Sequence, residues 1–438
     1  MTDHLDFTTG FPSVSDGGGS PEFHFSRMAE ILQGRPVSQV AVDGIDAVFI
    51  NDPALIRAIQ VKDSRKYVRG DLFQKGRNIS RAGLLLEDEA THRHYRRLSN
   101  PFLRVARVDE YVPAMRRIVS EAVASWRAGD QVNIQTEMCW ISGAIALAAL
   151  FPSPFPQPSR ELSDRLAVLI FETIRKPLYG KVAAANAQQT LTTPPKAREA
   201  VRESLLSYVE EQLRQPGFDT GYLSALLTDV DDAGERILTV DQICDETIMM
   251  LIAATATMAS VMSWALLVLS EEPTIEKRLF DDMPKTGDGD AGLGVERSSY
   301  TFRFLVEVLR LYPPVWIACR KTRSKIELGE HPLPKGVNVI FSSYMLHRNP
   351  DRYPDPDRFD PDRWLSDRPG AGDDTSYIPF GIGPKACIGE AFAWRELEVI
   401  LGTVMERWRL GTKPGSRVEP AAETTLHPNE LFMIPQPR

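Results

Sequence analysis

The sequence predicts a mainly α-helical protein with a minor β portion. Helical periodicity dominates from about residue 53 to residue 310. Past residue 320 the chain becomes irregular and rich in proline, with short runs of strand type such as Val337–Phe341. No internal repeat and no break in composition divides the chain. We therefore expect one domain over residues 23–438, preceded by a loose, polar, glycine-rich leader at residues 1–22.

Two strands and the start of a helix are expected near the N-terminus. The β-type runs Val37–Val42 and Ile45–Ile50 are separated by Asp43-Gly44, which is typical of a two-residue hairpin turn. Asp52 then fits the N-cap of a helix whose first residue is Pro53.

Residues Ile248 to Leu269 form an almost unbroken apolar run, long enough as a helix to span a bilayer. The flanking residues are acidic, and no excess of Lys or Arg on one side orients the run in a membrane. A buried central helix of a soluble domain explains it better. The first residues also lack the features of a signal peptide. We expect a cytoplasmic protein without a membrane anchor.

Charge and cysteine content exclude other classes of protein. The formal net charge is −8, so the chain has no general electrostatic attraction for nucleic acid. The four cysteines, at positions 139, 244, 319 and 387, are too few and too far apart for a disulfide framework or a C-x-x-C site.

One cysteine lies in a segment with chemical meaning. Two glycines permit an unusual backbone before Cys387, and a helical run over 390–401 follows it. The N-terminus of that helix would stabilise a thiolate, which is an electron-rich metal ligand. A single thiolate without partner ligands suits a haem, whose macrocycle supplies the other donors. A buried thiol in a glycine-rich turn is the alternative, but it does not explain the whole pattern. That pattern comprises Phe380, Gly381, Gly383, Lys385, Cys387 and Gly389.

This segment resembles the haem-binding loop of the cytochrome P-450 superfamily, with Lys385 where histidine or arginine is usual. The resemblance implies haem b as cofactor, Cys387 as its iron ligand, and the family's triangular helical prism with small β-sheets. It also implies a soluble, bacterial-type haem-thiolate monooxygenase.

Two further segments are similar to family motifs that stabilise the region beneath the haem. Glu307 and Arg310 share one helix face, and alone they would be an ordinary ion pair. The segment from Pro356 to Trp364 resembles the family's source of a second arginine. The resemblance implies a structural triad of Glu307, Arg310 and Arg363; Arg358 fits the register less well.

Haem propionates require cations. His92 and Arg96 are four residues apart on an expected helix, and the resemblance places both, with Arg320 and Lys385, at propionate positions. The alternative for His92 and Arg96 is a solvated basic helix face.

The apolar helix contains a segment similar to the family's distal motif over the haem. The resemblance places Ala253 against the haem and gives Thr257 a catalytic role, in which its hydroxyl relays a proton. Alternatively, that hydroxyl only bonds the carbonyl four residues earlier. Ala254 and Ala256 stand where the family usually has glycine and an acid. Ordered water, Thr255 or a polar group of the substrate would then supply the proton.

An apolar lining predicts a lipophilic substrate, and the resemblance to relatives that tailor terpenoids points to a secondary metabolite. The candidate lining residues are Leu72, Phe73, Val315, Trp316, Ile317, Leu431 and Phe432. The chain has no flavin or iron–sulfur motif, so electrons would come from a ferredoxin with its reductase or from a flavodoxin-like donor.

Two other functions stay open from the sequence. One is an oxidative cyclase or coupling enzyme that forms a C–C, C–N or C–O bond without inserting oxygen. The other is a non-enzymatic haem binder or sensor, which would need an output module in addition to the single expected domain.

Overall fold

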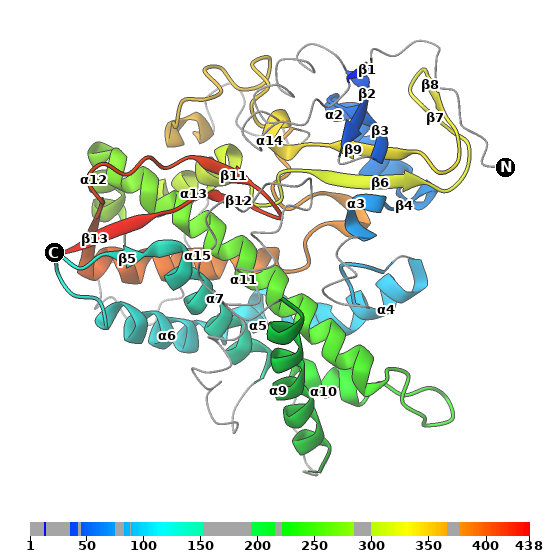
Figure 1. The fold of residues 1–438 in the computed structure, drawn as a ribbon, viewed down its shortest axis with the longest axis horizontal. Coiled ribbons are helices and arrows are strands. Elements are labelled where there is room, and N and C mark those ends of the chain that lie inside the picture. Colours follow the sequence, from blue (N-terminus) through cyan, green and yellow to red (C-terminus); the bar gives the residue numbers. More distant parts are fainter. Residues whose placement is uncertain are drawn as a thin grey trace.

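The computed structural model describes residues 13–14, 36–42, 45–74, 83–87, 89–151, 194–214, 221–283, 299–365 and 376–438. Within these ranges the fold is helical with small sheets, as predicted (Figure 1). The predicted leader lies outside the described residues except for Ser13–Val14. These two residues form strand β1, which pairs parallel with β2, and the expectation of a loose leader stays a prediction.

The largest sheet has six strands in the order β1-β2-β3-β9-β6-β4. Strand β2 pairs antiparallel with β3 in a register that places Val42 opposite Ile45, which confirms the predicted hairpin strands. The strand predicted at 337–341 is β9 and begins one residue later. These strands are β1 (Ser13–Val14), β2 (Val37–Val42), β3 (Ile45–Ile50), β4 (Tyr67–Arg69), β6 (Ala318–Thr322) and β9 (Asn338–Phe341).

The smaller sheets are formed mainly by the C-terminal part of the chain. Strand β13 lies between β10 and β5, while β11 pairs with β12 and β7 with β8. Their bounds are β5 (Val132–Asn133), β7 (Ile326–Leu328), β8 (His331–Leu333), β10 (Trp408–Thr412), β11 (Pro420–Ala422), β12 (Leu426–Pro428) and β13 (Phe432–Pro437).

The α-helices form the larger part of the fold. Helix α2 begins as predicted, because the Asp52 side chain accepts the Leu55 N–H at 2.8 Å. The helices are α2 (Pro53–Arg57), α3 (Asp71–Gln74), α4 (Glu89–Ser99), α5 (Val105–Asp109), α6 (Val112–Ala124), α7 (Ile134–Leu150), α9 (Pro194–Arg214), α10 (Tyr222–Leu227), α11 (Val240–Glu271), α12 (Pro273–Asp282), α13 (Tyr300–Leu311), α14 (Ser343–Leu346) and α15 (Glu390–Arg407).

Helix α11 is the central element of the helical part. A capping box between Thr239 and Gln242 starts it, and it packs along α7 and α15 (Figure 1). It is long and apolar enough to cross a membrane, but 83% of its most apolar stretch is buried inside the fold. A helix that is apolar all round and covered by its neighbours is a core helix, as predicted.

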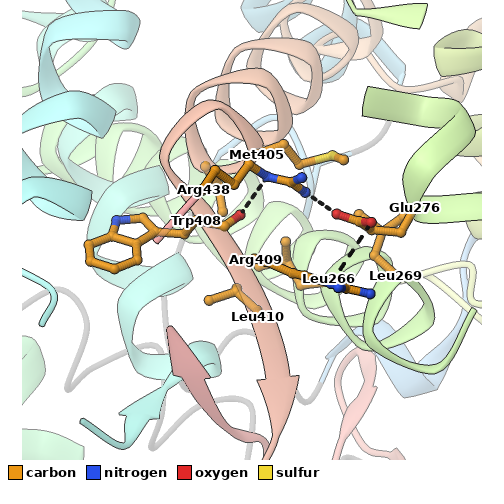
Figure 2. A pocket seen from close by; sticks show the side chains of 9 residues that line it. Leu266, Leu269, Glu276, Met405, Trp408, Arg409, Leu410 and Arg438 are labelled. Atoms are coloured by element: carbon orange, nitrogen blue, oxygen red, sulfur yellow. Dashed lines mark hydrogen bonds and ion pairs between the residues drawn. The ribbon is translucent and has the colours of Figure 1, made fainter. Parts of the chain in front are cut away.

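The C-terminal strand is fastened to the helices at a small pocket (Figure 2). Two arginines, Arg438 and Arg409, converge there on the buried carboxylate of Glu276 in α12. The Arg438 guanidinium also lies 4.2 Å from the centre of the Phe280 ring. The pocket floor is apolar and includes Leu266 and Met405. None of the predicted site residues lines this pocket, and its contacts join secondary-structure elements to one another.

Candidate active site

The loop before Cys387 adopts a backbone that requires glycine. Gly381 and Gly383 have φ values of 67° and 75°, in the left-handed region. A Cβ atom on Gly383 would lie 2.3 Å from the Gln60 carbonyl oxygen, so a larger residue would also push the loop off that segment. The Cys387 N–H donates to the Phe380 carbonyl at 2.8 Å, which closes the loop directly before α15.

The Cys387 sulfur is accessible and yet surrounded by protein. The residue is exposed to solvent, whereas burial raises the pKa of its thiol. An exposed residue and a raised pKa are compatible if the sulfur faces an internal space. Protein atoms around such a space reduce the hydration of the sulfur while leaving it open to a bound group. The Gly389 N–H and the positive charge of Arg96 act in the opposite direction and lower the pKa. Burial has the larger effect, so the thiol pKa is raised overall, and the Gly389 N–H and Arg96 are the groups that would stabilise a thiolate bound to iron.

Two of the four predicted cations lie on α4, and Arg96 reaches the cysteine loop. Its Nη1 donates to the Ala386 carbonyl at 2.8 Å. His92 is buried on the same helix, and Lys385 is half-buried in the loop itself. Arg320 is buried in β6, where its Nη1 donates to the Cys319 carbonyl at 2.9 Å. The contact of these side chains with propionates stays a prediction.

The structure brings Glu307, Arg310 and Arg363 together. Glu307 and Arg310 are both fully buried in α13, and Arg310 donates Nε to Oε2 at 2.8 Å and Nη2 to Oε1 at 2.9 Å. Arg363 Nε adds a bond to Oε1 at 3.0 Å. Arg358 contributes its backbone carbonyl, which accepts from both arginines.

Two residues that the sequence did not single out belong to this network. Trp364 Nε1 donates to Glu307 Oε2 at 2.8 Å. His347 is buried and accepts the Ile378 N–H at its Nε2 at 2.9 Å, while its Nδ1 lies 3.2 Å from the Arg310 carbonyl oxygen. Burial lowers the pKa of His347 to about 3, so the ring is neutral and Nδ1–H donates to Arg310. His347 thus joins α13 to the segment that leads into Phe380. In the sequence, the only indication of this role is that His347 lies shortly before the motif Pro356–Trp364.

One face of α11 is less covered than the rest of the helix. Between Ile243 and Leu269, all of which the structure describes, the residues that are not fully buried are Met250, Ala253, Ala254 and Thr257. Their spacing places them on one side, which we call the distal face. Thr257 Oγ1 donates to the Ala253 carbonyl at 2.8 Å, the contact expected of the alternative interpretation. Its oxygen keeps lone pairs that can accept another proton donor. Thr255 is fully buried on another side, so it is poorly placed to supply that donor.

The predicted substrate-lining residues divide into three groups. Leu72, Trp316 and Ile317 are buried in one apolar cluster with Leu426, and Val315 beside them is 45% exposed. Phe73 is in α3, but its side chain lies outside the described part.

The third group, Leu431 and Phe432, lies at the start of the small sheet that contains β13, and its role in lining the site stays a prediction. The carbonyl of Leu431 accepts the Ile134 N–H at 2.9 Å, and Phe432 pairs with Asn133. The hairpin β11–β12 also lies beside α11, where Trp264 Nε1 donates to the Leu426 carbonyl at 3.0 Å. Trp316 Nε1 also donates to the Glu423 carbonyl, at 2.9 Å.

These residues fit a haem held by one protein ligand. An accessible sulfur, an adjacent N–H and a nearby guanidinium form a thiolate site. Within the described ranges, no three His, Cys, Asp or Glu side chains gather as in a metal site built from protein ligands alone. The donor set therefore matches a macrocycle that brings its own nitrogens.

Comparisons with known proteins agree with this chemistry. Residues 24–438 match the family model described as cytochrome P-450. The chain is 30% identical to cyclooctatin synthase of Streptomyces melanosporofaciens over 88% of this chain and 85% of that protein. It is 31% identical to pentalenene oxygenase of Streptomyces avermitilis over 86% and 85%. The fold is similar to the retinoic acid-bound cyanobacterial CYP120A1, with a TM-score of 0.80, 21% identity and coverage of 95% and 94%. The chain belongs to the cytochrome P-450 family, the haem-thiolate monooxygenases.

Proposed function

We propose that this monooxygenase oxidises a terpenoid or a similarly apolar secondary metabolite. The observation that carries the proposal is the apolar distal face, whose only polar side chain is Thr257. Val315 is apolar and yet exposed, so it offers a further apolar surface for a substrate of this kind. Relatives named for pentalenene and for cyclooctat-9-en-7-ol support this substrate class.

In the proposed reaction, the haem supplies the iron at which dioxygen is reduced for attack on a carbon–hydrogen bond. Cys387 would hold the iron, and the Gly389 N–H would donate to its sulfur. Thr257 would hold a hydroxyl proton on the distal face of α11. Ala256 has no proton to give, so water or a polar group of the substrate would resupply this hydroxyl.

Replacement of Thr257 by alanine is expected to preserve haem and substrate binding while diverting electrons to hydrogen peroxide. Thr257 is only partly buried, so alanine should disturb the packing little. Its hydroxyl is, however, the only proton carrier on the distal face. We expect product formed per NADPH consumed to fall about a hundredfold, the lower end of the usual contribution of general acid–base catalysis. Thr257→Ser is the matched control and should retain coupling. Full coupling in Thr257→Ala would show that the hydroxyl has no catalytic role and only bonds the Ala253 carbonyl.

We further propose that a separate ferredoxin or flavodoxin-like protein delivers electrons near α4 and α5. Arg93, Arg97 and Arg104 are exposed there, close in sequence to Arg96, which contacts the cysteine loop. Arg97 also lies 3.9 Å from Asp229, a longer and weaker contact than the pair of Arg107 with Glu110, in which the Arg107 charge is largely balanced. An otherwise acidic chain with this local positive charge can steer an acidic partner.

Arg97→Glu tests this partner surface. Arg97 is 71% exposed, so reversing its charge should slow reduction by the partner roughly tenfold at low salt, an effect that high salt should remove. Arg117→Glu, on α6, is the matched control. Reduction rates that are flat against ionic strength, or equal in the two variants, reject docking at this surface.

The remaining features of the proposal are a single haem domain over residues 23–438 and a cytoplasmic location. The buried α11 supports the location, because its apolar surface is already covered by protein.

The test of the proposed function is a screen of terpenoids against the ferric holoenzyme, followed by product analysis. A binding substrate displaces water from the iron and shifts the Soret band. Turnover with a reconstituted donor should then give a product that has gained one oxygen atom. Loss of hydrogen without gain of oxygen would instead identify an oxidative coupling enzyme. No electron consumption with any binding terpenoid would reject the proposed substrate class.

A further inference from the structure

The carboxylate of Glu246, on α11, is fully buried. It belongs neither to the haem-binding residues nor to the network around Glu307. Its Oε1 accepts the Tyr222 hydroxyl at 2.7 Å, and its Oε2 accepts the Leu84 N–H at 2.6 Å. Burial raises the pKa of Glu246, whereas these two donors lower it. A buried carboxyl with a donor on each oxygen is fixed in one orientation.

Through these bonds Glu246 joins segments that are far apart in the sequence. Tyr222 is the first residue of α10, and its hydroxyl oxygen lies 3.0 Å from Ser99 Oγ at the end of α4. The preceding residue, Asp245, is held by Arg202 of α9 at 2.7 Å. The carboxyl group therefore sits where α4, α10 and α11 meet.

Glu246 also holds the turn formed by residues 83–87, through its bond to the Leu84 N–H. The Leu86 and Glu87 N–H groups both donate to the Gly83 carbonyl at 3.0 Å, and the Leu84 carbonyl accepts from Arg69 Nη2 at 3.5 Å. Gly83 has a φ of 126°, and a Cβ there would lie 2.7 Å from Glu246 Oε2. Only glycine lets the turn approach the carboxyl group this closely.

The position of Glu246 relates this turn to the distal face. Glu246 precedes Met250, Ala253 and Thr257 by four, seven and eleven residues, so it lies on the same side of α11. At the helical rise it is about 16 Å from Thr257 along the axis. The turn therefore covers the N-terminal end of the distal face. Leu84 and Leu86 are buried in it, whereas Leu85 between them is 37% exposed.

We propose that Glu246 is a positioning residue that fixes the turn of residues 83–87 over this end of the distal face and so limits the size of molecule that reaches the haem. The Leu84 N–H bond sets the place of the turn, and the exposed Leu85 side chain forms part of the barrier. Removal of the carboxylate frees the turn without touching Cys387 or Thr257. The inference rests on haem binding in the proposed function but not on the terpenoid substrate.

The test uses the holoenzyme with two iron-binding probes, imidazole and the larger phenylimidazole. Glu246→Gln and Glu246→Ala should speed hydrogen exchange in residues 83–87 about tenfold, the effect of leaving one buried donor without its acceptor. Phenylimidazole should then bind faster by a similar factor, about tenfold, while imidazole keeps its rate. Tyr222→Phe, which removes only one hydroxyl, should change both quantities in the same direction by less.

Glu271→Gln, at the exposed end of the same helix, is the control and should behave as the parent. If the Glu246 variants fail to retain haem, Tyr222→Phe decides alone. Unchanged exchange in residues 83–87, or an equal change in the binding rates of both probes, would overturn the proposal. Neither probe is oxidised in this assay, so such a failure leaves the proposed reaction untouched.

Discussion

Replacement of Cys387 by serine or histidine is expected to abolish the red-shifted Soret band that thiolate-ligated ferrous haem gives with carbon monoxide. The band requires a thiolate, and Cys387 is the cysteine whose sulfur is accessible, with an N–H and a guanidinium that favour its ionised form. Histidine can bind iron, so Cys387→His should retain some haem but move the band to shorter wavelength.

The other three cysteines serve as controls. Cys139, Cys244 and Cys319 are buried, and burial raises the pKa values of their thiols to about 12, about 11 and about 11. These groups stay protonated at neutral pH, so serine in their place should leave the band intact. A band that persists in Cys387→Ser and disappears in one of the other variants would contradict the assignment.

Glu307→Gln is expected to have the second largest effect. The fully buried Glu307 carboxylate accepts bonds from the fully buried Arg310 and from the partly buried Arg363, Trp364 and Asp360 N–H. Breaking a buried ion pair from one side costs about 3–5 kcal/mol, because charged groups are left without a counter-charge. Thermal unfolding monitored with haem content should show a much lower midpoint and release of haem.

Trp364→Phe is the matched control, since it removes one donor and keeps both charges. We expect a loss of about 1–3 kcal/mol, the cost of leaving one buried acceptor group short of a partner. Equal stability of Glu307→Gln and the parent would show that the network does not support the cysteine loop.

Local patterns in the sequence predicted individual elements well. The hairpin strands, the Asp52 cap and the central apolar helix each follow from residues that are neighbours in the chain. The order of the strands did not follow, because β3 pairs with β9 and β4 with β6 across more than two hundred residues. Pairing over such separations depends on the packing of the whole domain.

The same distinction applies to the site. The resemblance to family motifs predicted three members of the network, Glu307, Arg310 and Arg363. The other members, His347 and Trp364, are defined by tertiary contacts. For Leu431 and Phe432 the apolar character predicted a pocket wall but not the pairing of Phe432 with Asn133, because an apolar pair fits a pocket wall and a sheet strand equally well. For Thr257, the sequence left two roles open, and the bond to Ala253 is compatible with both.

The most direct test of the haem-thiolate monooxygenase account is the origin of the oxygen in the product. The holoenzyme, a reconstituted electron donor and a terpenoid that shifts the Soret band are incubated under isotopically labelled dioxygen, and the product is analysed by mass spectrometry. The account predicts one labelled oxygen atom in each product molecule, and no label when Cys387→Ser replaces the parent. A product that carries oxygen from water, or none at all, would contradict it.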